Sequence, residues 1–196
     1  LGQLVDLRLI RLLGGLGLGD RLLADLADLS LPPLHPELPI IVSVGCLTAT
    51  GFPGANRVAV TGVSPQTGLT STSWMGGDFG TAFARSGTLS LVLQGRAPQP
   101  PIVVVTEQGV TVVPRPDLWG KTVPETEEAL HNRLGIKGLK IASIGPAGEN
   151  KVLFASIMTS AYRAFGRGGP GAVMGGKHLK AVAVHGSHHL DTADKA

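Results

Sequence analysis

Apolar residues along this chain gather in short runs interrupted by glycine and proline, a pattern typical of short strands joined by tight turns. These β-prone runs predict strands over 40–44, 58–63, 67–73, 102–105, 110–113, 139–143 and 152–158. The turn 106–109 lies between two of the runs and predicts a β-hairpin.

One helix is marked by signals at both of its ends. Thr122 and Glu125 have the spacing of a capping box, and Pro124 suits a first helical turn. Gly135 is a typical stop signal, so the helix is predicted to end at Leu134.

A second amphipathic helix is predicted near the N-terminus. A glycine turn at 15–20 precedes Leu22, Leu26 and Leu29, which recur at helical spacing. The turn reads GxGxG rather than GxGxxG, and no clean βαβ unit surrounds it, so a dinucleotide-binding fingerprint is disfavoured. Three prolines within 32–36 then predict a rigid connector.

The chain contains an internal repeat. Residues 76–95 and 168–186 each contain a glycine pair, a short helix-compatible segment, a strand-like run and a closing glycine. Upstream, 64–68 is echoed by 143–148. A glycine turn that opens a short helix can aim backbone N–H groups at an anion. The repeat therefore predicts two similar sites, for a ligand with two equivalent phosphate-bearing halves or for two copies of one ligand.

Composition favours a single α+β domain over the 196 residues, with many tight turns. Aromatic residues make up 4% and charged residues 16%, and the net charge of +3 comes from scattered side chains, so nucleic-acid binding is disfavoured. No apolar run approaches the roughly 20 residues that span a bilayer. The leucine-rich start has no signal-peptide cleavage pattern, so we expect a cytoplasmic protein without membrane contact.

Several reactive residue types have a structural as well as a functional interpretation. The lone Cys46 is predicted to be a small buried apolar residue, and it excludes an internal disulfide or a four-cysteine cluster within this chain. The histidines at 185, 188 and 189 are predicted to lie in a solvated tail rather than in a metal site. The glutamates at 125, 127 and 128 suit a solvated helix face near the helix N-terminus.

Arginines sharpen the expectation of anion binding. Arg163 and Arg167 stand beside the second glycine pair, where charged donors would strengthen an anion site. Arg57, taken by itself, is predicted to be an exposed charge that precedes a strand.

Beyond these patterns, the chain resembles a known family. The runs SIGPAGEN at 143–150 and GRGGPGAVMG at 166–175, with 64–68, 76–80 and 118–121, are similar to the N-terminal domain of tungsten-dependent aldehyde:ferredoxin oxidoreductases. The resemblance covers about residues 14–186, which would be the core of the domain.

The resemblance implies an α+β fold of two intertwined β-sheets with short helices and an internal pseudo-twofold duplication. It also implies a tungsten (or molybdenum) ion held by two pyranopterins whose phosphates are bridged by magnesium. The residues that match the family's cofactor-binding positions are Arg57, Trp74, Gly76, Gly77, Arg163, Ala164, Gly168 and Gly169. Arg57 would lie between a pterin and the iron–sulfur cluster, and the backbone carbonyls of Trp74 and Ala164 would be the magnesium ligands.

Two departures from the family pattern bear on function. Trp74 stands where the family commonly has a small polar residue such as Asn, so its side chain is expected to narrow the pocket. Family enzymes ligate a [4Fe–4S] cluster through four cysteines of later domains, whereas this chain has one cysteine.

The implied activity is oxidation of aldehydes to carboxylic acids with ferredoxin as acceptor, and this chain alone is predicted to be inactive. Its expected partners are C-terminal domains or a separate subunit that carries the cluster, and a homo-oligomer is also possible. The alternative is a stand-alone, non-catalytic binding module of the same fold.

Overall fold

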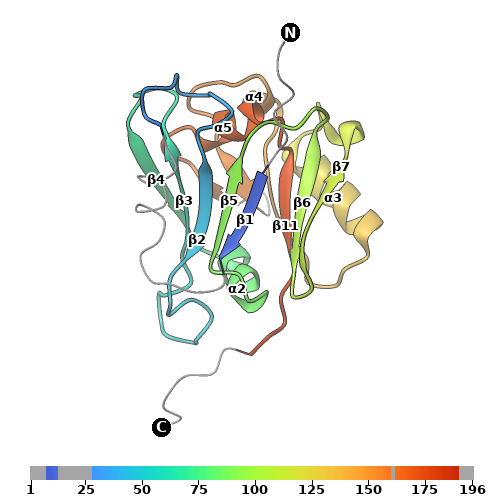
Figure 1. The fold of residues 1–196 in the computed structure, drawn as a ribbon. Helices are drawn as coiled ribbons and strands as arrows, with labels where there is room; N and C mark the ends of the chain where they lie inside the picture. Colours follow the sequence, from blue (N-terminus) through green and yellow to red (C-terminus); the bar gives the residue numbers. More distant parts are fainter. Residues whose placement is uncertain (1–7, 13–27, 160–161, 190–196) are drawn as a thin grey trace.

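The computed structural model describes residues 8–12, 28–159 and 162–189. In this part of the chain, two β-sheets enclose short helices (Figure 1). The strands are β1 (Arg8–Leu12), β2 (Ile40–Val44), β3 (Val58–Val63), β4 (Thr70–Met75), β5 (Ser90–Gln94), β6 (Pro101–Thr106), β7 (Gly109–Pro114), β8 (Lys140–Ser143), β9 (Ile157–Thr159), β10 (Arg163–Phe165) and β11 (Ala181–Val184). The helices are α2 (Asp78–Arg85), α3 (Val123–Leu134), α4 (Pro146–Glu149) and α5 (Pro170–Gly176), with a 3₁₀ turn η1 (Pro116–Leu118).

The order of the strands reveals the duplication. The five-stranded sheet has the order β1-β5-β2-β3-β4, and the six-stranded sheet has the order β10-β9-β8-β11-β6-β7. The unit β5-β2-β3-β4 therefore matches the unit β11-β8-β9-β10, and every neighbouring pair within both units is antiparallel. Helix α2 joins β4 to β5, as α5 joins β10 to β11. This topology confirms the predicted α+β fold with an internal repeat.

The two halves are intertwined through their helices and edge strands. Helix α2 packs against β8 and β11 of the second half, and α5 packs against β2 and β3 of the first. The equivalent edge strands β4 and β10 also contact each other. Because β4 and β10 are counterparts, this contact lies on the approximate twofold axis that relates the halves.

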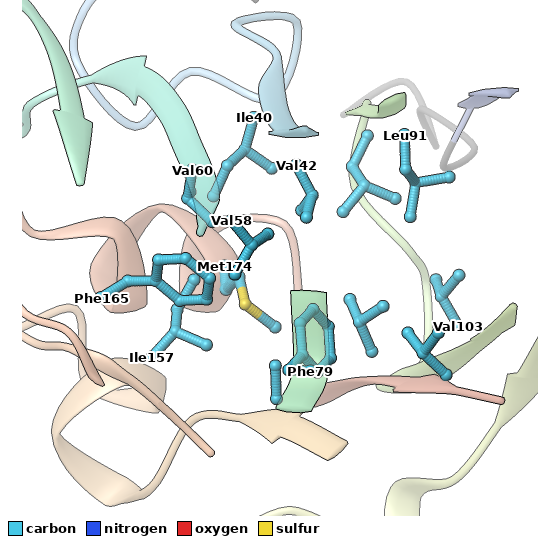
Figure 2. Close-up of a cluster of buried hydrophobic side chains, with 14 of the residues drawn as sticks. Ile40, Val42, Val58, Val60, Phe79, Leu91, Val103, Ile157, Phe165 and Met174 are labelled. Carbon is cyan, nitrogen blue, oxygen red and sulfur yellow. The ribbon is translucent and has the colours of Figure 1, made fainter. Parts of the chain in front are cut away.

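The main hydrophobic core lies between the two sheets (Figure 2). Val58 and Val60 of β3 contribute to it from one sheet, Val103 of β6 contributes from the other, and Phe79 and Met174 come from the helices α2 and α5. A second cluster joins the opposite face of the six-stranded sheet to α3. Strands β6 and β11 are therefore buried on both faces, which explains why all their residues but Thr106 at the end of β6 are apolar.

Most predicted elements are confirmed. Strands β2 and β3 have the predicted bounds, and the hairpin is formed by β6 and β7. Helix α3 begins with the capping box, in which the backbone N–H of Thr122 donates to Glu125 Oε2 at 2.8 Å, and it ends at Gly135 with φ 61°. The glycine turn at 15–20 and most of its predicted helix lie outside the described residues.

Two expectations are wrong. The strand predicted over 152–158 begins only at Ile157, because the preceding residues form α4 and a turn whose carbonyl at Ala155 accepts the N–H of Gly171. The echo between 64–68 and 143–148 is not a structural equivalence. The first segment joins β3 to β4, whereas the second follows β8, the counterpart of β2.

Candidate functional site

The contact between β4 and β10 brings most of the predicted site residues together. Trp74 lies on β4 and is followed by the first glycine pair, and Arg163 and Ala164 lie on β10, shortly before the second pair. The backbone N–H of Arg167 donates to Ser73 Oγ at 3.2 Å, which ties the end of β10 to β4. We call this contact of the two edge strands the β4–β10 seam.

The first glycine pair faces an open cleft. Gly77 precedes α2 with φ 98° and ψ −168°, a conformation that only glycine adopts readily. A Cβ at this position would lie 3.5 Å from Arg163 Cγ, so the arginine side chain passes directly over the turn. The adjoining cleft has a volume of about 310 Å³, and its lining residues are Gly77, Asp78, Phe79, Lys140, Thr159, Tyr162 and Arg163.

The cleft carries net positive charge. Its lining contributes the cations Lys140 and Arg163 and a single carboxylate, Asp78. Lys140 Nζ lies 3.3 Å from Asp78 Oδ2, and both side chains reach solvent. The arrangement suits an anionic ligand, because guanidinium and ammonium donors form strong charge-assisted hydrogen bonds to phosphate or carboxylate oxygens.

The second glycine pair is closely packed instead of open. Gly168 and Gly169 have φ values of 77° and 64°, and Gly169 begins α5. A Cβ on Gly168 would overlap the Ser71 side chain, and a Cβ on Gly169 would overlap the carbonyl oxygen of Leu153. Neither residue lines the cleft beside Gly77. The two turns hold equivalent places in the topology, but only the first borders this cleft, so the two sites predicted from the repeat differ in their openness.

The backbone of Trp74 is directed toward the outer edge of β4. The N–H of Ser64 donates to the carbonyl of Leu69 at 2.9 Å, which makes this a hydrogen-bonded pair of the β3–β4 hairpin. Pairs alternate along an antiparallel ladder, so the pair formed by Ala59 and Trp74 is a non-hydrogen-bonded one. The N–H and C=O of Trp74 therefore face away from β3, on the edge of β4 beside β10, and the residue is 61% exposed.

Arg57 lies next to the first glycine pair. Its Nη1 would be 4.0 Å from a Cβ on Gly76, and the residue is exposed, as predicted. The preceding loop is held by Thr48, whose buried side-chain hydroxyl donates to the carbonyls of Ala55 and Arg57 at 3.2 and 3.3 Å. Sequence and structure thus place Arg57 at the same end of β4 as the first turn.

A buried ion pair was missed by the sequence analysis. Lys180, which has no exposed surface, donates from Nζ to the carbonyl of Lys121 at 2.7 Å and to Glu149 Oε1 at 2.5 Å. The other Glu149 oxygen accepts the backbone N–H of Gly120 at 2.8 Å. Burial lowers the pKa of Lys180 below the usual lysine value, and Glu149 opposes that shift. These bonds join two family-like motifs, 118–121 and 143–150, to β11.

A second buried lysine lies three residues earlier. Lys177 Nζ donates to the carbonyls of Pro36 and Leu38 at 2.7 and 2.6 Å. Burial lowers the pKa of Lys177 to about 8, against an opposing effect of Glu37. In the sequence, Lys177 directly follows the glycines that end α5, and Lys180 directly precedes the apolar strand β11.

The other reactive side chains lie away from the seam. Cys46 is exposed in the loop after β2, so the prediction that it is buried is wrong: the strand alternation ends at Val44. His188 Nε2 lies 3.7 Å from Glu107 Oε2 at the far end of β6.

Within the described ranges, no three or more His, Cys, Asp and Glu side chains gather in a way that could hold a metal ion. None of the helices in those ranges is long and apolar enough to span a bilayer.

Comparisons with known proteins agree on one family. Residues 4–186 match the sequence model described as "Aldehyde ferredoxin oxidoreductase, N-terminal domain". Tungsten-containing aldehyde ferredoxin oxidoreductases of Pyrococcus furiosus and Thermococcus kodakarensis are 43% and 44% identical to the chain over 183 residues. Each alignment covers 93% of this chain and 30% of the relative, so the chain spans about a third of the length of these curated relatives.

More distant relatives share the same domain. An aliphatic sulfonate oxidoreductase, WOR-like subunit, of Pyrococcus furiosus is 32% identical over 192 residues, covering 90% of this chain and 30% of that protein. Among solved structures, the active-site complex BamBC of benzoyl coenzyme A reductase, with bound 1,5-dienoyl-CoA, superposes with a TM-score of 0.86 at 37% identity. That match covers 91% of this chain and 27% of the compared chain.

Proposed function

Because the chain belongs to the aldehyde ferredoxin oxidoreductase family through that family's N-terminal domain, we propose that it is the platform that holds a tungsten pterin cofactor. The observation that carries this proposal is the β4–β10 seam. Its two edge strands hold equivalent positions in the duplicated topology, with Gly77 beside Arg163 and Gly168 beside Ser71 of β4. A cofactor built from two similar pterin halves would match that approximate twofold symmetry.

The donor set of the seam fits such a group. The Trp74 carbonyl faces the outer edge of β4, where a hard cation such as magnesium could be ligated by backbone oxygen. Ala164, on the adjacent β10, would supply the second carbonyl. Arg163 passes over Gly77, where its guanidinium would bind a pterin phosphate or ring. Within the described ranges, no His, Cys, Asp and Glu cluster competes as a metal site.

The remaining candidates would orient the same ligand. Gly76 and Gly77 would allow the ligand to approach the backbone. Gly168 and Gly169 are closely packed, so they would contribute by allowing the turn of the main chain that leads from β10 into α5. Arg57, which directly precedes β3 and lies beside the end of β4, would project toward the electron-transfer side. When bound, the cofactor supplies the two-electron redox chemistry, and the chain supplies placement and positive charge.

The complete enzyme would need sequence outside these 196 residues. One cysteine is too few for a [4Fe–4S] cluster, so the cluster and the second wall of the cofactor site would come from further domains or a partner subunit. Exposed aromatic side chains lie at the seam and its cleft at Trp74 and Tyr162, as expected where another domain docks. Ferredoxin would then accept the electrons.

The reaction proposed is oxidation of an aldehyde to a carboxylic acid, as the names of the more similar relatives indicate. Relatives that share this domain carry names that refer to an aldehyde, a sulfonate and benzoyl coenzyme A. Substrate choice would therefore depend on the domains that cover the site, with the present chain serving as the common platform.

Metal and pterin content test the platform directly. The chain, produced in a tungsten-fed host that makes the pterin, should retain tungsten and pterin after purification, measured by plasma mass spectrometry and pterin fluorescence. Arg163→Ala should reduce both about tenfold, since a charge-assisted contact is lost. Arg133→Ala is the matched control, because Arg133 is an exposed arginine that lies near Asp117, away from the seam.

Equal tungsten in wild type and Arg163→Ala would contradict the assignment of the site. A loaded chain that gains no aldehyde oxidation when combined with cluster-bearing domains would favour the alternative, a non-catalytic binding module.

A further inference from the structure

We propose that Lys140 is a further anion-binding residue of the cleft beside Gly77, and that Asp78 is its internal counter-ion, which an incoming anion displaces. The inference rests on the proposed function, because it assigns another contact of the same site. Asp78 lies within the family-like motif 76–80, but neither residue is among the site residues predicted from the sequence. The structure assigns them through the lining of the cleft and one ion pair.

The cleft is built from both halves of the molecule. Gly77 and Asp78 come from the start of α2 in the first half, whereas Lys140, Thr159 and Arg163 come from β8, β9 and β10 in the second. Lys140 is the first residue of β8, and α2 packs on that strand, which fixes the lysine opposite the helix start. Two cations from one half therefore face the turn that the other half supplies.

The ion pair between Lys140 and Asp78 is suited to exchange. The distance between Nζ and Oδ2 is 3.3 Å, and the side chains are 34% and 80% exposed. Exposed ion pairs of this kind contribute little stability, because water solvates both partners well. An anionic ligand with a larger negative charge can therefore replace the Asp78 carboxylate beside Lys140 with little loss of free energy.

Thr159 offers a neutral donor on the floor of the cleft. The residue is buried, and its hydroxyl lies 3.3 Å from Met75 Sδ, a weak hydrogen-bond acceptor. A phosphate or carboxylate oxygen would be a better acceptor for that hydroxyl. The cleft thus offers a hydroxyl from Thr159, a guanidinium from Arg163 and an ammonium from Lys140. These donors predict a ligand with several anionic oxygens, such as a phosphate or pyrophosphate group.

Charge-changing variants separate this role from a structural clamp between α2 and β8. Pyrophosphate would be titrated into the 196-residue chain at low salt and neutral pH, with binding heat measured by calorimetry. Lys140→Met should weaken binding about tenfold. Asp78→Asn should strengthen binding about threefold, because a competing negative charge is removed. Lys137→Met is the control, since Lys137 is exposed and does not line the cleft.

Opposite effects of the two variants, with no effect of Lys137→Met, are the expected result. A weaker complex in both Lys140→Met and Asp78→Asn would identify a structural clamp and overturn the proposal. So would equal affinities of Lys140→Met and Lys137→Met. Thermal melting of each variant, followed by circular dichroism, verifies that loss of binding is not loss of fold.

A second experiment identifies the source of the anion. It also separates failure of the Lys140 proposal from failure of the proposed cofactor platform. Lys140→Met is produced in the tungsten-fed host, and its tungsten and pterin content is compared with wild type. A loss of about tenfold assigns the contact to a pterin phosphate. Pyrophosphate binding that depends on Lys140, in a chain that retains no pterin when it is produced in the tungsten-fed host, would support this site and contradict the platform. Full tungsten content in Lys140→Met, together with unchanged pyrophosphate affinity, would contradict this site and leave the platform intact.

Discussion

The two glycine-pair turns hold the same position in a duplicated topology, yet only one has room for a ligand. At Gly77 the neighbours are the flexible side chain of Arg163 and an open cleft. At Gly169 the neighbours are the backbone carbonyl of Leu153 and the ring of Pro65. Duplication thus produced two equivalent turns, and the segment between β8 and β9 filled the space around the second.

Leu153 belongs to the loop that follows α4, and α4 has no helical counterpart between β2 and β3 among the described residues. Helix α4 packs against α5 so closely that a Cβ on Gly175 would overlap the carbonyl of Gly148. In the first half, the corresponding connection is the exposed loop that contains Cys46 and Phe52 and ends at Arg57. The turn of the first half therefore borders an open cleft, whereas the turn of the second half is closely packed.

The largest expected effect comes from adding a methyl group to the packed turn. Gly169→Ala should lower the free energy of unfolding by about 4 kcal/mol, from the left-handed backbone and the overlap with Leu153. Gly77→Ala should cost only about 2 kcal/mol, because strain at φ 98° acts without a backbone overlap. Urea unfolding measures both. Equal losses at the two glycines would remove the distinction between an open and a packed turn.

The buried ion pair of Lys180 and Glu149 tests how much the packed second half contributes to the free energy of unfolding. Lys180→Met should lower the free energy of unfolding by about 3 kcal/mol, since one oxygen of the buried Glu149 loses its donor while the other keeps Gly120. Thr88, in the corresponding segment before β5, is a buried neutral residue bonded to Ser86. Thr88→Val should cost about 1 kcal/mol, as a lost neutral hydrogen bond does. A smaller loss for Lys180→Met than for Thr88→Val would contradict this comparison.

Sequence reasoning predicted the duplicated parts well because their signals are local. A glycine pair before a helix, a capping box and a Gly stop each require particular backbone angles, and Gly77, Thr122 and Gly135 meet those requirements. Arg163 and Gly77 were assigned to one site by resemblance, and the structure brings them into contact.

The misses depend on long-range packing that a local pattern does not contain. The sequence patterns do not single out Lys177 or Lys180, yet carbonyls far along the chain and Glu149 satisfy their buried ammonium groups. Lys140 and Asp78 lie 62 residues apart in sequence and meet only because α2 packs on β8. Their proximity depends on the packing of a helix of one half against a strand of the other half, and no single segment of the sequence shows this packing.

A pH-dependent stability is expected from Lys177 in the second half. Its pKa is about 8 in the folded chain and 10.5 in the ordinary case, so between these values the unfolded chain binds more protons. Stability should therefore rise as pH increases from about 8 toward 10.5, by about 2–3 kcal/mol. Urea unfolding of wild type and Lys177→Met at pH 7.5 and 10 isolates this effect. A wild-type stability that falls relative to the variant over this range would contradict it.

The smallest expected effect compares the ends of α2 and α5. Each helix is followed by a residue with positive φ, Gly87 at 75° and His178 at 61°. The αL conformation costs a non-glycine residue about 1 kcal/mol, so Gly87→Ala should destabilise by that amount.

At His178 the cost is already present and is offset by contacts: Nδ1 lies 3.1 Å from the Ala97 carbonyl oxygen, and the ring packs edge-on to Trp119 at 5.2 Å. His178→Gly relieves the strain but loses both contacts, so urea unfolding should show a net change of about 1 kcal/mol or less. A gain well above 1 kcal/mol would mean that the imidazole contributes nothing and that the end of α5 is merely strained.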